Sequence, residues 1–159
     1  TNVLRHVGKG PALVVFLIDV TKGILPVLIA RTLLKADSWE VLIGLTALSG
    51  HIWPIWLRGK GGKAVATGLG MLIGISWPVG LACLGVFLLT LSLSRIVSLS
   101  SVIASLSLPV LMVLSFHGGN FRTPYFFVSI SAMSMVIWRH RSNMRRFFAG
   151  EEPKIGQSR

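Results

Sequence analysis

The residues with the clearest chemical potential lie in one short basic segment, LRGKGGKAVATG, at positions 57–68. The segment combines cations with a pair of glycines: Arg58, Lys60, Gly61, Gly62 and Lys63. Glycine lets backbone N–H groups approach a ligand closely, and the N-terminal end of a following helix attracts anions. The segment differs from a Walker A motif, which has Ser or Thr after its lysine, whereas Ala64 follows Lys63. The pattern favours phosphate binding; the alternative is a turn that is basic only for membrane topology.

Two charged residues, Asp19 and Lys22, interrupt an otherwise apolar stretch near the start of the chain. They are three positions apart, so a helix places them on the same face. Charges inside a membrane cost about 2.5–3.5 kcal/mol each on insertion scales, and they usually pair or line a cavity. Two interpretations stay open: a structural salt bridge, or a lysine that faces a phosphate pocket while the aspartate holds it. Asp19 is the only carboxylate in a predicted span, and a proton-relay transporter would be expected to have more.

Two histidines and an asparagine near the predicted membrane surface are further candidates. His51 lies about one turn before the basic segment, where it either forms an interfacial hydrogen bond or contacts a substrate. His140 and Asn143 follow the last apolar run, in the segment HRSNMRRFF. Arginines after a last span are typical of membrane topology, but the Asn143 amide could also orient a hydroxyl or carbonyl group.

The composition places these residues in a membrane protein. Of the 159 residues, 52% are hydrophobic and 13% are charged, against about 25% charged in a typical soluble domain. No Asp, Glu, Lys or Arg occurs over 64–94, 96–121 or 123–138. Because a membrane-spanning helix needs about 20 apolar residues, we expect an all-α, polytopic membrane helical bundle in contact with membrane lipid.

The net charge of +11 arises from 16 Lys and Arg against 5 Asp and Glu. Basic residues mark the cytoplasmic loops of membrane proteins, and they can also hold anionic substrates or lipid head groups. Binding of nucleic acid is not expected, because the cations are scattered among the spans and do not line one soluble face. The single cysteine, Cys83, lies within an apolar run, which argues against a disulfide framework or a thiolate metal site.

The apolar runs and their breaks predict about six membrane segments. We expect spans over the following residues: 11–34, 41–57, 64–75, 78–94, 96–116 and 123–138. A break near Pro78 is expected because proline inside a helix removes a hydrogen bond and clashes with the preceding turn. With this break, the positive-inside rule is satisfied if three basic clusters lie in the cytoplasm: 5–9, 58–63 and 139–146. The polar candidates would then meet at one membrane face.

Taken together, the motifs resemble the bacterial acyl-phosphate:glycerol-3-phosphate acyltransferases, small integral membrane enzymes often called PlsY. TNVLRHVG, at 1–8, looks like the end of the family's first motif, and GHIWPIWLRGKGGKAVATG, at 50–68, looks like its glycine-rich second motif. HRSNMRRFFAGEEPKIG, at 140–156, looks like the third motif, and DVTKG, at 19–23, fits the family's Asp-x-x-Lys-Gly pattern. The resemblance extends over essentially the whole chain.

The resemblance implies a seven-helix fold, of which about six helices would lie in residues 1–159, as a single acyltransferase domain without its N-terminal helix. The front of the first motif, including a serine implicated in catalysis in the family, would then precede Thr1, where the chain starts without a methionine. Ala64 stands where the family commonly has glycine. Activity is therefore expected of the full-length enzyme and not necessarily of residues 1–159 alone.

The resemblance also implies a reaction: transfer of a fatty acyl group from acyl phosphate to the 1-hydroxyl of glycerol 3-phosphate, giving lysophosphatidic acid and phosphate, the first step of phospholipid synthesis. Three residues are expected to be catalytic: Arg5, Lys63 and Asn143. Three are expected to hold the acyl-phosphate head: Gly61, Gly62 and Lys63. Five are expected to bind glycerol 3-phosphate: Arg5, Lys60, His51, His140 and Asn143. Two are expected to support the site: Asp19 and Lys22. No metal or cofactor is expected.

For location and partners, the resemblance implies a multi-pass protein of the bacterial inner (plasma) membrane with its active-site loops on the cytoplasmic face. The enzyme that makes acyl phosphate is a further expected partner. One rival interpretation is a transporter or channel for an organic anion, which predicts flux across liposomes and no ester product. Another is a scaffold that binds anionic lipids through its basic tail, and it predicts salt-sensitive lipid binding that survives loss of Lys63 and Asn143.

Overall fold

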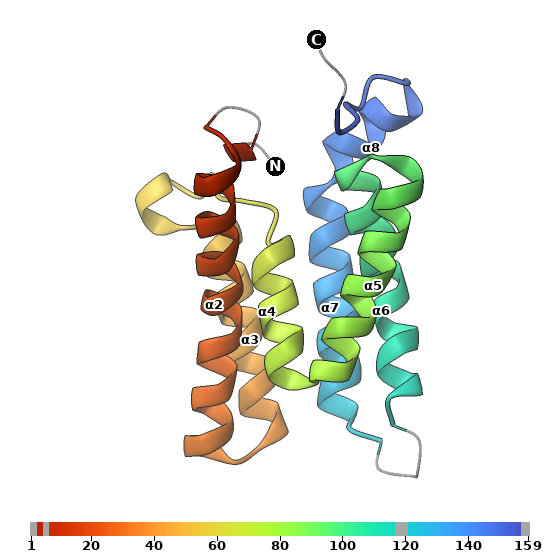
Figure 1. Ribbon diagram of the computed structural model, residues 1–159. Helices are drawn as coiled ribbons and strands as arrows, with labels where there is room; N and C mark the ends of the chain where they lie inside the picture. Colours follow the sequence, from red (N-terminus) through yellow and green to blue (C-terminus); the bar gives the residue numbers. More distant parts are fainter. Residues whose placement is uncertain (1–2, 5–6, 117–120, 157–159) are drawn as a thin grey trace. The chain divides into compact units, whose positions relative to one another are not determined.

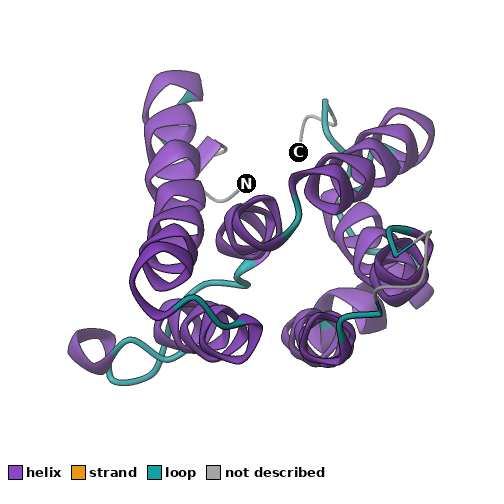
Figure 2. Cartoon of the chain, turned by 90° about the horizontal axis from the view of Figure 1, so that it is seen from below, coloured by secondary structure: helices purple, strands orange, loops and turns teal. Residues whose placement is uncertain are grey.

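The described part of the chain is built of helices joined by short connections (Figures 1 and 2), and the helices before α8 (Arg141–Phe148) follow the apolar runs of the sequence. The structure is a computed structural model that describes residues 3–4, 7–116 and 121–156, so the predicted site residue Arg5 lies outside the described residues. The described part contains these elements: α2 (Lys9–Leu34), α3 (Asp37–Ile52), η1 (Ile55–Leu57), α4 (Val65–Ile75), α5 (Trp77–Ser94), α6 (Val97–Leu114), α7 (Thr123–Arg139) and α8 (Arg141–Phe148). No strand occurs among these residues, which confirms the all-α class.

The predicted break in the long central apolar run is confirmed. Helix α4 ends at Ile75 and α5 begins at Trp77. Pro78 is the second residue of α5, where its missing N–H group would have no acceptor within the helix in any case.

The span predicted over 41–57 begins too late, because α3 starts at Asp37. Its predicted end is confirmed for the span, which runs over Asp37–Leu57, although α3 itself ends at Ile52 and η1 completes the span. Asp37 and Glu40 lie in its first turn, where carboxylates interact favourably with the positive end of the helix dipole. The helix stops before Pro54, since the residue before a proline is disfavoured in the α conformation.

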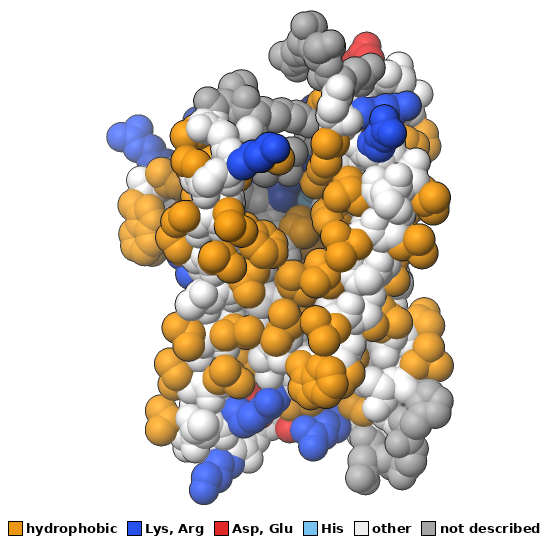
Figure 3. Space-filling model, viewed as in Figure 1, with side chains coloured by type: hydrophobic (Ala, Val, Ile, Leu, Met, Phe, Trp, Pro, Cys, Tyr) orange, Lys and Arg blue, Asp and Glu red, His pale blue; other side chains and the backbone are white. Residues whose placement is uncertain are grey.

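Four helical segments of the described chain are long and apolar enough to cross a membrane: α2, α3 continued through η1, α5 and α6. Helix α4 has 11 residues, which is about 16 Å at the usual rise per residue. Helix α7 has 17 residues. On the face shown in Figure 3, hydrophobic side chains cover the stretches between helix ends, and Lys and Arg gather near those ends. These features are those of an integral membrane protein.

The chain divides into two compact units, Thr1–Trp77 and Pro78–Arg159. In the first unit, α2, α3 and α4 alternate in direction, so the segment that connects α3 to α4 lies at the same end as the start of α2 (Figure 1). We call this the loop end of the first unit. In the second unit, α5, α6 and α7 also alternate, and α8 follows α7 directly at the end where α5 turns into α6 (Figure 1).

Glycines bring α2 and α4 of the first unit into close contact. A Cβ atom on Gly23 of α2 would overlap the carbonyl oxygen of Thr67, and one on Gly70 of α4 would overlap the carbonyl oxygen of Val20. Small residues allow this kind of backbone approach between membrane helices. The crossing holds residues 19–23 of α2 against the first turns of α4, next to the basic segment.

Replacing Gly70 with Ala should destabilise the first unit. The added methyl group meets a backbone oxygen that cannot rotate away, and overpacking typically costs about 1–3 kcal/mol. Gly85→Ala in α5 is the matched control, because nothing lies within 4 Å of an added Cβ there and Ala favours helix over Gly. Thermal unfolding in detergent should show a lower Tm for Gly70→Ala and an unchanged or higher Tm for Gly85→Ala. Equal Tm values would contradict the close crossing.

A polar clamp joins the three helices at the other end of the first unit. Arg31 of α2 donates from Nε to Glu40 Oε1 at 3.1 Å and from Nη2 to Glu40 Oε2 at 2.8 Å. The same Nη2 donates to the carbonyl oxygen of Ile75 at 2.8 Å, where the last carbonyls of α4 lack helical partners. Glu40 is only 4% exposed, and a buried carboxylate requires such a charged, hydrogen-bonded partner.

In the second unit, α6 packs against α7 and presents serines at buried positions: Ser98, Ser100, Ser101 and Ser105. The last three donate their hydroxyl hydrogens to carbonyl groups of the preceding turn, so these buried hydroxyls are satisfied. After α8 the chain returns to the turn between α5 and α6, where the Ile155 N–H donates to the Arg95 carbonyl oxygen at 2.8 Å.

Candidate functional site

The glycine pair of the basic segment folds back onto the end of α3. The Gly61 N–H donates to the Ile52 carbonyl oxygen at 3.1 Å, and the Gly62 N–H donates to the His51 carbonyl oxygen at 3.2 Å. Carbonyl groups in the last turn of a helix have no helical donors, so the segment caps α3. These two glycine N–H groups, which were expected to face a ligand, donate within the protein.

Close packing explains why both positions are glycine. A Cβ atom on Gly61 would overlap the carbonyl oxygens of His51 and Ile52. A Cβ atom on Gly62 would overlap Nε2 of the His51 imidazole. Any side chain at either position would therefore push the segment away from α3.

The N-terminal end of α4 provides the positive potential that an anion requires. Helix α4 begins at Val65, and the N–H groups of its first turn have no helical acceptors. Lys63 precedes it by two residues and has an exposed side chain. Ala64 has φ 58, a left-handed conformation that costs a non-glycine residue about 1–2 kcal/mol. Glycine would adopt this conformation without that cost.

A polar cluster lies beside the glycine pair at the loop end of the first unit. Asp19 Oδ1 lies 3.4 Å from Lys22 Nζ and 3.5 Å from His51 Nδ1. Thr67 Oγ1 lies 3.1 Å from the same His51 nitrogen. The Lys22 side chain is 59% exposed and the Asp19 side chain is 17% exposed. Asp19 faces His51 as well as Lys22, which goes beyond the simple salt bridge.

The first unit thus brings several predicted site residues together around one segment: Asp19, Lys22, His51, Gly61 and Gly62. Lys60 and Lys63 are exposed on the same segment. Thr67 was not predicted as a site residue. Its sequence position gave no clear signal, because Thr67 lies 16 positions after His51. The two side chains meet only because α3 and α4 pack antiparallel.

The second unit holds a separate group around Glu152. Asn143 Nδ2 and Ser98 Oγ both donate to Glu152 Oε1 at 2.6 Å. Arg146 Nε donates to Glu152 Oε2 at 2.9 Å. Asn143 is 5% exposed and the Glu152 side chain is 6% exposed, so this carboxylate orients the Asn143 amide in a nearly buried setting.

The Glu152 carboxylate is held in its charged form. Burial alone raises the pKa of Glu152, but the hydrogen bonds from Ser98 and Asn143 and the charge and hydrogen bond of Arg146 lower it more, so its pKa is below the usual glutamate value. Glu152 is missing from the predicted site residues. The turn at Gly150, with φ 75, brings this glutamate back to α8, and a run of two adjacent glutamates does not reveal which one turns inward.

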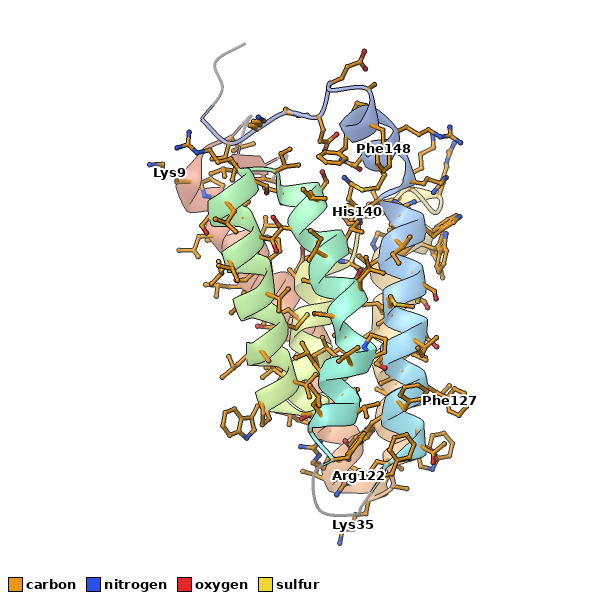
Figure 4. The ribbon with its side chains drawn as sticks, turned by 90° about the vertical axis from the view of Figure 1, so that its right-hand side faces the viewer. Lys9, Lys35, Arg122, Phe127, His140 and Phe148 are labelled. Atoms are coloured by element: carbon orange, nitrogen blue, oxygen red, sulfur yellow. The ribbon has the colours of Figure 1, made fainter. Side chains whose placement is uncertain are left out.

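His140 lies at the junction of α7 and α8, at the same end of the second unit as Phe148 (Figure 4). It is 2% exposed, and its Nδ1 is 2.8 Å from the Val136 carbonyl oxygen. Because a carbonyl oxygen only accepts, this contact places the proton of a neutral ring on Nδ1 and leaves Nε2 as the acceptor nitrogen. His140 and Asn143 are therefore both positioned by the α7–α8 junction.

Comparison with known proteins identifies the family. The family model described as glycerol-3-phosphate acyltransferase matches residues 1–150. The glycerol-3-phosphate acyltransferase of Prochlorococcus marinus (strain MIT 9313) is 68% identical over 158 residues, which cover 99% of this chain and 77% of the relative. Those of Prochlorococcus marinus (strain NATL1A) and Parasynechococcus marenigrum (strain WH8102) are 61% and 64% identical over 157 residues, which cover 99% of this chain and 79% and 72% of the relatives.

Solved structures show the same fold. The crystal structure of PlsY, an integral membrane glycerol 3-phosphate acyltransferase, in its glycerol 3-phosphate form has a TM-score of 0.91 and 33% identity, and the match covers 98% of this chain and 76% of PlsY. The lysophosphatidic acid form has the same TM-score and identity and is covered to 78%. From its sequence and its fold, the chain belongs to the glycerol-3-phosphate acyltransferase family.

Proposed function

We propose that this chain transfers a fatty acyl group from acyl phosphate to the 1-hydroxyl of glycerol 3-phosphate, giving lysophosphatidic acid and phosphate in the first step of phospholipid synthesis. Relatives with 60–68% identity have the name glycerol-3-phosphate acyltransferase. PlsY has been solved in a glycerol 3-phosphate form and a lysophosphatidic acid form, and these ligands are the acceptor and the product of this reaction. The family match over residues 1–150 is the observation that carries the proposal.

The basic segment is proposed to hold the acyl-phosphate head. Lys63 is exposed beside the start of α4, so a phosphate there would meet both a full positive charge and the positive end of a helix. Gly61 and Gly62 contribute by keeping that segment against α3 without side chains that would displace it. Supporting this assignment, the segment combines cations and a helix start in one short stretch.

Glycerol 3-phosphate is proposed to bind to Arg5, Lys60 and Asn143, with His51 and His140 in support. A second dianion needs its own cations, which Arg5 and Lys60 would supply. The amide of Asn143 is held by Glu152, and a fixed amide suits the orientation of a glycerol hydroxyl.

The chemistry follows from the donor. The 1-hydroxyl oxygen forms an ester bond to the acyl carbon, while the bond between that carbon and the phosphate oxygen breaks. Acyl phosphate is a mixed anhydride, so its acyl carbon is already activated and no covalent acyl-enzyme is needed. A phosphate oxygen of the substrate accepts the hydroxyl proton. Lys63 stabilises the negative charge on the leaving phosphate, and juxtaposition of the two substrates supplies much of the remaining rate enhancement.

The orientation of the protein in the membrane is proposed from the positions of its basic residues. We propose that about six segments of a single acyltransferase domain, including the short α4 and α7, cross or enter the inner membrane, with the basic segment and α8 on the cytoplasmic side. The positive-inside rule supports this orientation, because Arg58, Lys60 and Lys63 lie in one connection and Arg141, Arg145 and Arg146 lie in α8. The enzyme that makes acyl phosphate would then deliver the donor at the same face.

The donor is tested by offering the purified full-length protein radiolabelled glycerol 3-phosphate with palmitoyl phosphate or with palmitoyl-CoA. We expect labelled lysophosphatidic acid and an equal amount of released phosphate from palmitoyl phosphate only. Use of the thioester alone would overturn the donor assignment. Flux of glycerol 3-phosphate across liposomes without ester formation would instead support the transporter.

A further inference from the structure

The imidazole of His51 connects all three helices at the loop end of the first unit. His51 lies in the last turn of α3, and its Nδ1 faces Thr67 Oγ1 of α4 at 3.1 Å and Asp19 Oδ1 of α2 at 3.5 Å. Its other nitrogen, Nε2, lies against Gly62, where even a Cβ atom would overlap it. One ring therefore contacts two neighbouring helices and the basic segment.

The two oxygens at Nδ1 determine how the ring is held. A carboxylate only accepts hydrogen bonds, and a hydroxyl can accept or donate. A hydrogen on Nδ1 therefore suits both Asp19 and Thr67, with Thr67 at hydrogen-bond distance and Asp19 adding electrostatic attraction. Thr67 is 0% exposed, so it cannot itself contact a substrate at the surface of the unit.

We propose that His51 is a positioning residue: Thr67 and Asp19 fix its ring through Nδ1, and the ring holds Gly62, and with it Lys63, at the start of α4. His51 then supports both substrates through the segment, the acyl phosphate through Lys63 and glycerol 3-phosphate through Lys60, without touching either. This inference rests on the proposed function of Lys63. It gives the loop end a cross-helix clamp that corresponds to the Arg31 clamp at the other end of the unit.

Thr67→Val tests the clamp, because valine keeps the size of threonine and removes the hydroxyl. In the full-length protein, it should raise the KM for palmitoyl phosphate by about 10–100-fold, since misplacement of a binding group by about 1 Å can cost that much. The KM for glycerol 3-phosphate should change less, because Lys60 is only one of its proposed contacts. Thr67→Ser should restore the KM for palmitoyl phosphate. Thr46→Val is the matched control, because the Thr46 hydroxyl donates only to Leu42 within α3 at 2.8 Å.

A second readout does not depend on activity. Trypsin cleaves after Lys and Arg, and the segment contains three such sites: Arg58, Lys60 and Lys63. Local opening is reported by proteolysis, so Thr67→Val and His51→Phe, which keeps a ring but removes both nitrogens, should be cut faster at these sites than the original protein. Thr46→Val and Thr67→Ser should be cut at the original rate. Mass spectrometry of the fragments identifies the cleaved bonds.

The outcomes separate this inference from the proposed function. Unchanged cleavage of the segment in Thr67→Val and His51→Phe would overturn the positioning role, even if activity fell. A rise confined to the KM for glycerol 3-phosphate would also overturn it and would make His51 a direct contact. If the original protein does not use palmitoyl phosphate, the proposed function fails, and the cleavage rates alone decide whether His51 holds the segment.

Discussion

Replacing Lys63 with Ala should lower acyl transfer from palmitoyl phosphate on the order of 10²–10³-fold, the usual effect of removing one group that stabilises transition-state charge. The phosphate leaves with a full negative charge, and Lys63 is the cation next to the positive end of α4. The effect should appear mainly in kcat/KM for the acyl phosphate. Steady-state assays of the full-length protein in detergent measure it directly.

Arg58→Asn is the matched control for Lys63→Ala. Arg58 contributes the same charge from the same segment, and its left-handed backbone, with φ 49, is one that asparagine tolerates. If the position of Lys63 beside α4 is what matters, and not the net charge of the segment, Arg58→Asn should change kcat/KM by only a few-fold. Similar losses in both variants would show that the segment acts by net charge alone, and near-normal turnover of Lys63→Ala would remove Lys63 from the phosphate site.

Glu152→Ala should be the most damaging substitution in the second unit. It leaves the hydroxyl of Ser98 and the amide of Asn143 without their shared acceptor, and a buried donor without an acceptor costs about 1–3 kcal/mol. The Arg146 side chain is 45% exposed, so water can replace the hydrogen bond that it loses with Glu152. We expect a clearly lower Tm together with reduced kcat, because Asn143 loses its fixed orientation. Glu151→Ala, which changes the exposed neighbouring glutamate, should leave both quantities near their original values.

The pH dependence of stability provides a second test of Glu152. Its pKa is lowered in the folded protein, so the folded state favours the charged form and gains stability at a pH above the usual glutamate pKa, about 4.3. This contribution should disappear as the pH falls below that value and through the lower pKa of the folded state. Tm measured from neutral pH down to a pH of about 3, below the usual glutamate pKa, should therefore fall more steeply for the original protein than for Glu152→Gln. Parallel curves would contradict a charged Glu152 network.

Much of the fold could be predicted from local patterns. Runs without charged residues located the helices, because a helix in a membrane must be apolar over most of its length. Pro78 located the end of α4, because proline cannot continue the preceding helix. The cations and glycines of residues 57–68 marked this segment as a candidate phosphate-binding site. Residue type alone indicates this, because Lys and Arg supply positive charge and Gly lets backbone N–H groups approach a ligand.

The boundary of α3 was harder to predict. Hydropathy favoured 41–57, whereas the helix begins at Asp37 and stops at Ile52. Acidic residues in a first turn and a proline two residues past the end are weaker signals than apolar length, and they decided the outcome. Sequence patterns report such termini poorly, because helix ends depend on a few capping interactions.

The partners of the polar residues were decided by tertiary structure. Asp19 faces His51 as well as Lys22, Asn143 is held by Glu152, and the N–H groups of Gly61 and Gly62 point to α3. Apart from the contact between Asp19 and Lys22, which are three positions apart on one helix, none of these contacts follows from spacing along the chain. Each depends on how far one helix is rotated and shifted against the next, and that is set by packing, such as the glycine crossing of α2 and α4. Residue type thus determines which chemistry is possible, and the packing of the helices determines which groups meet to perform it.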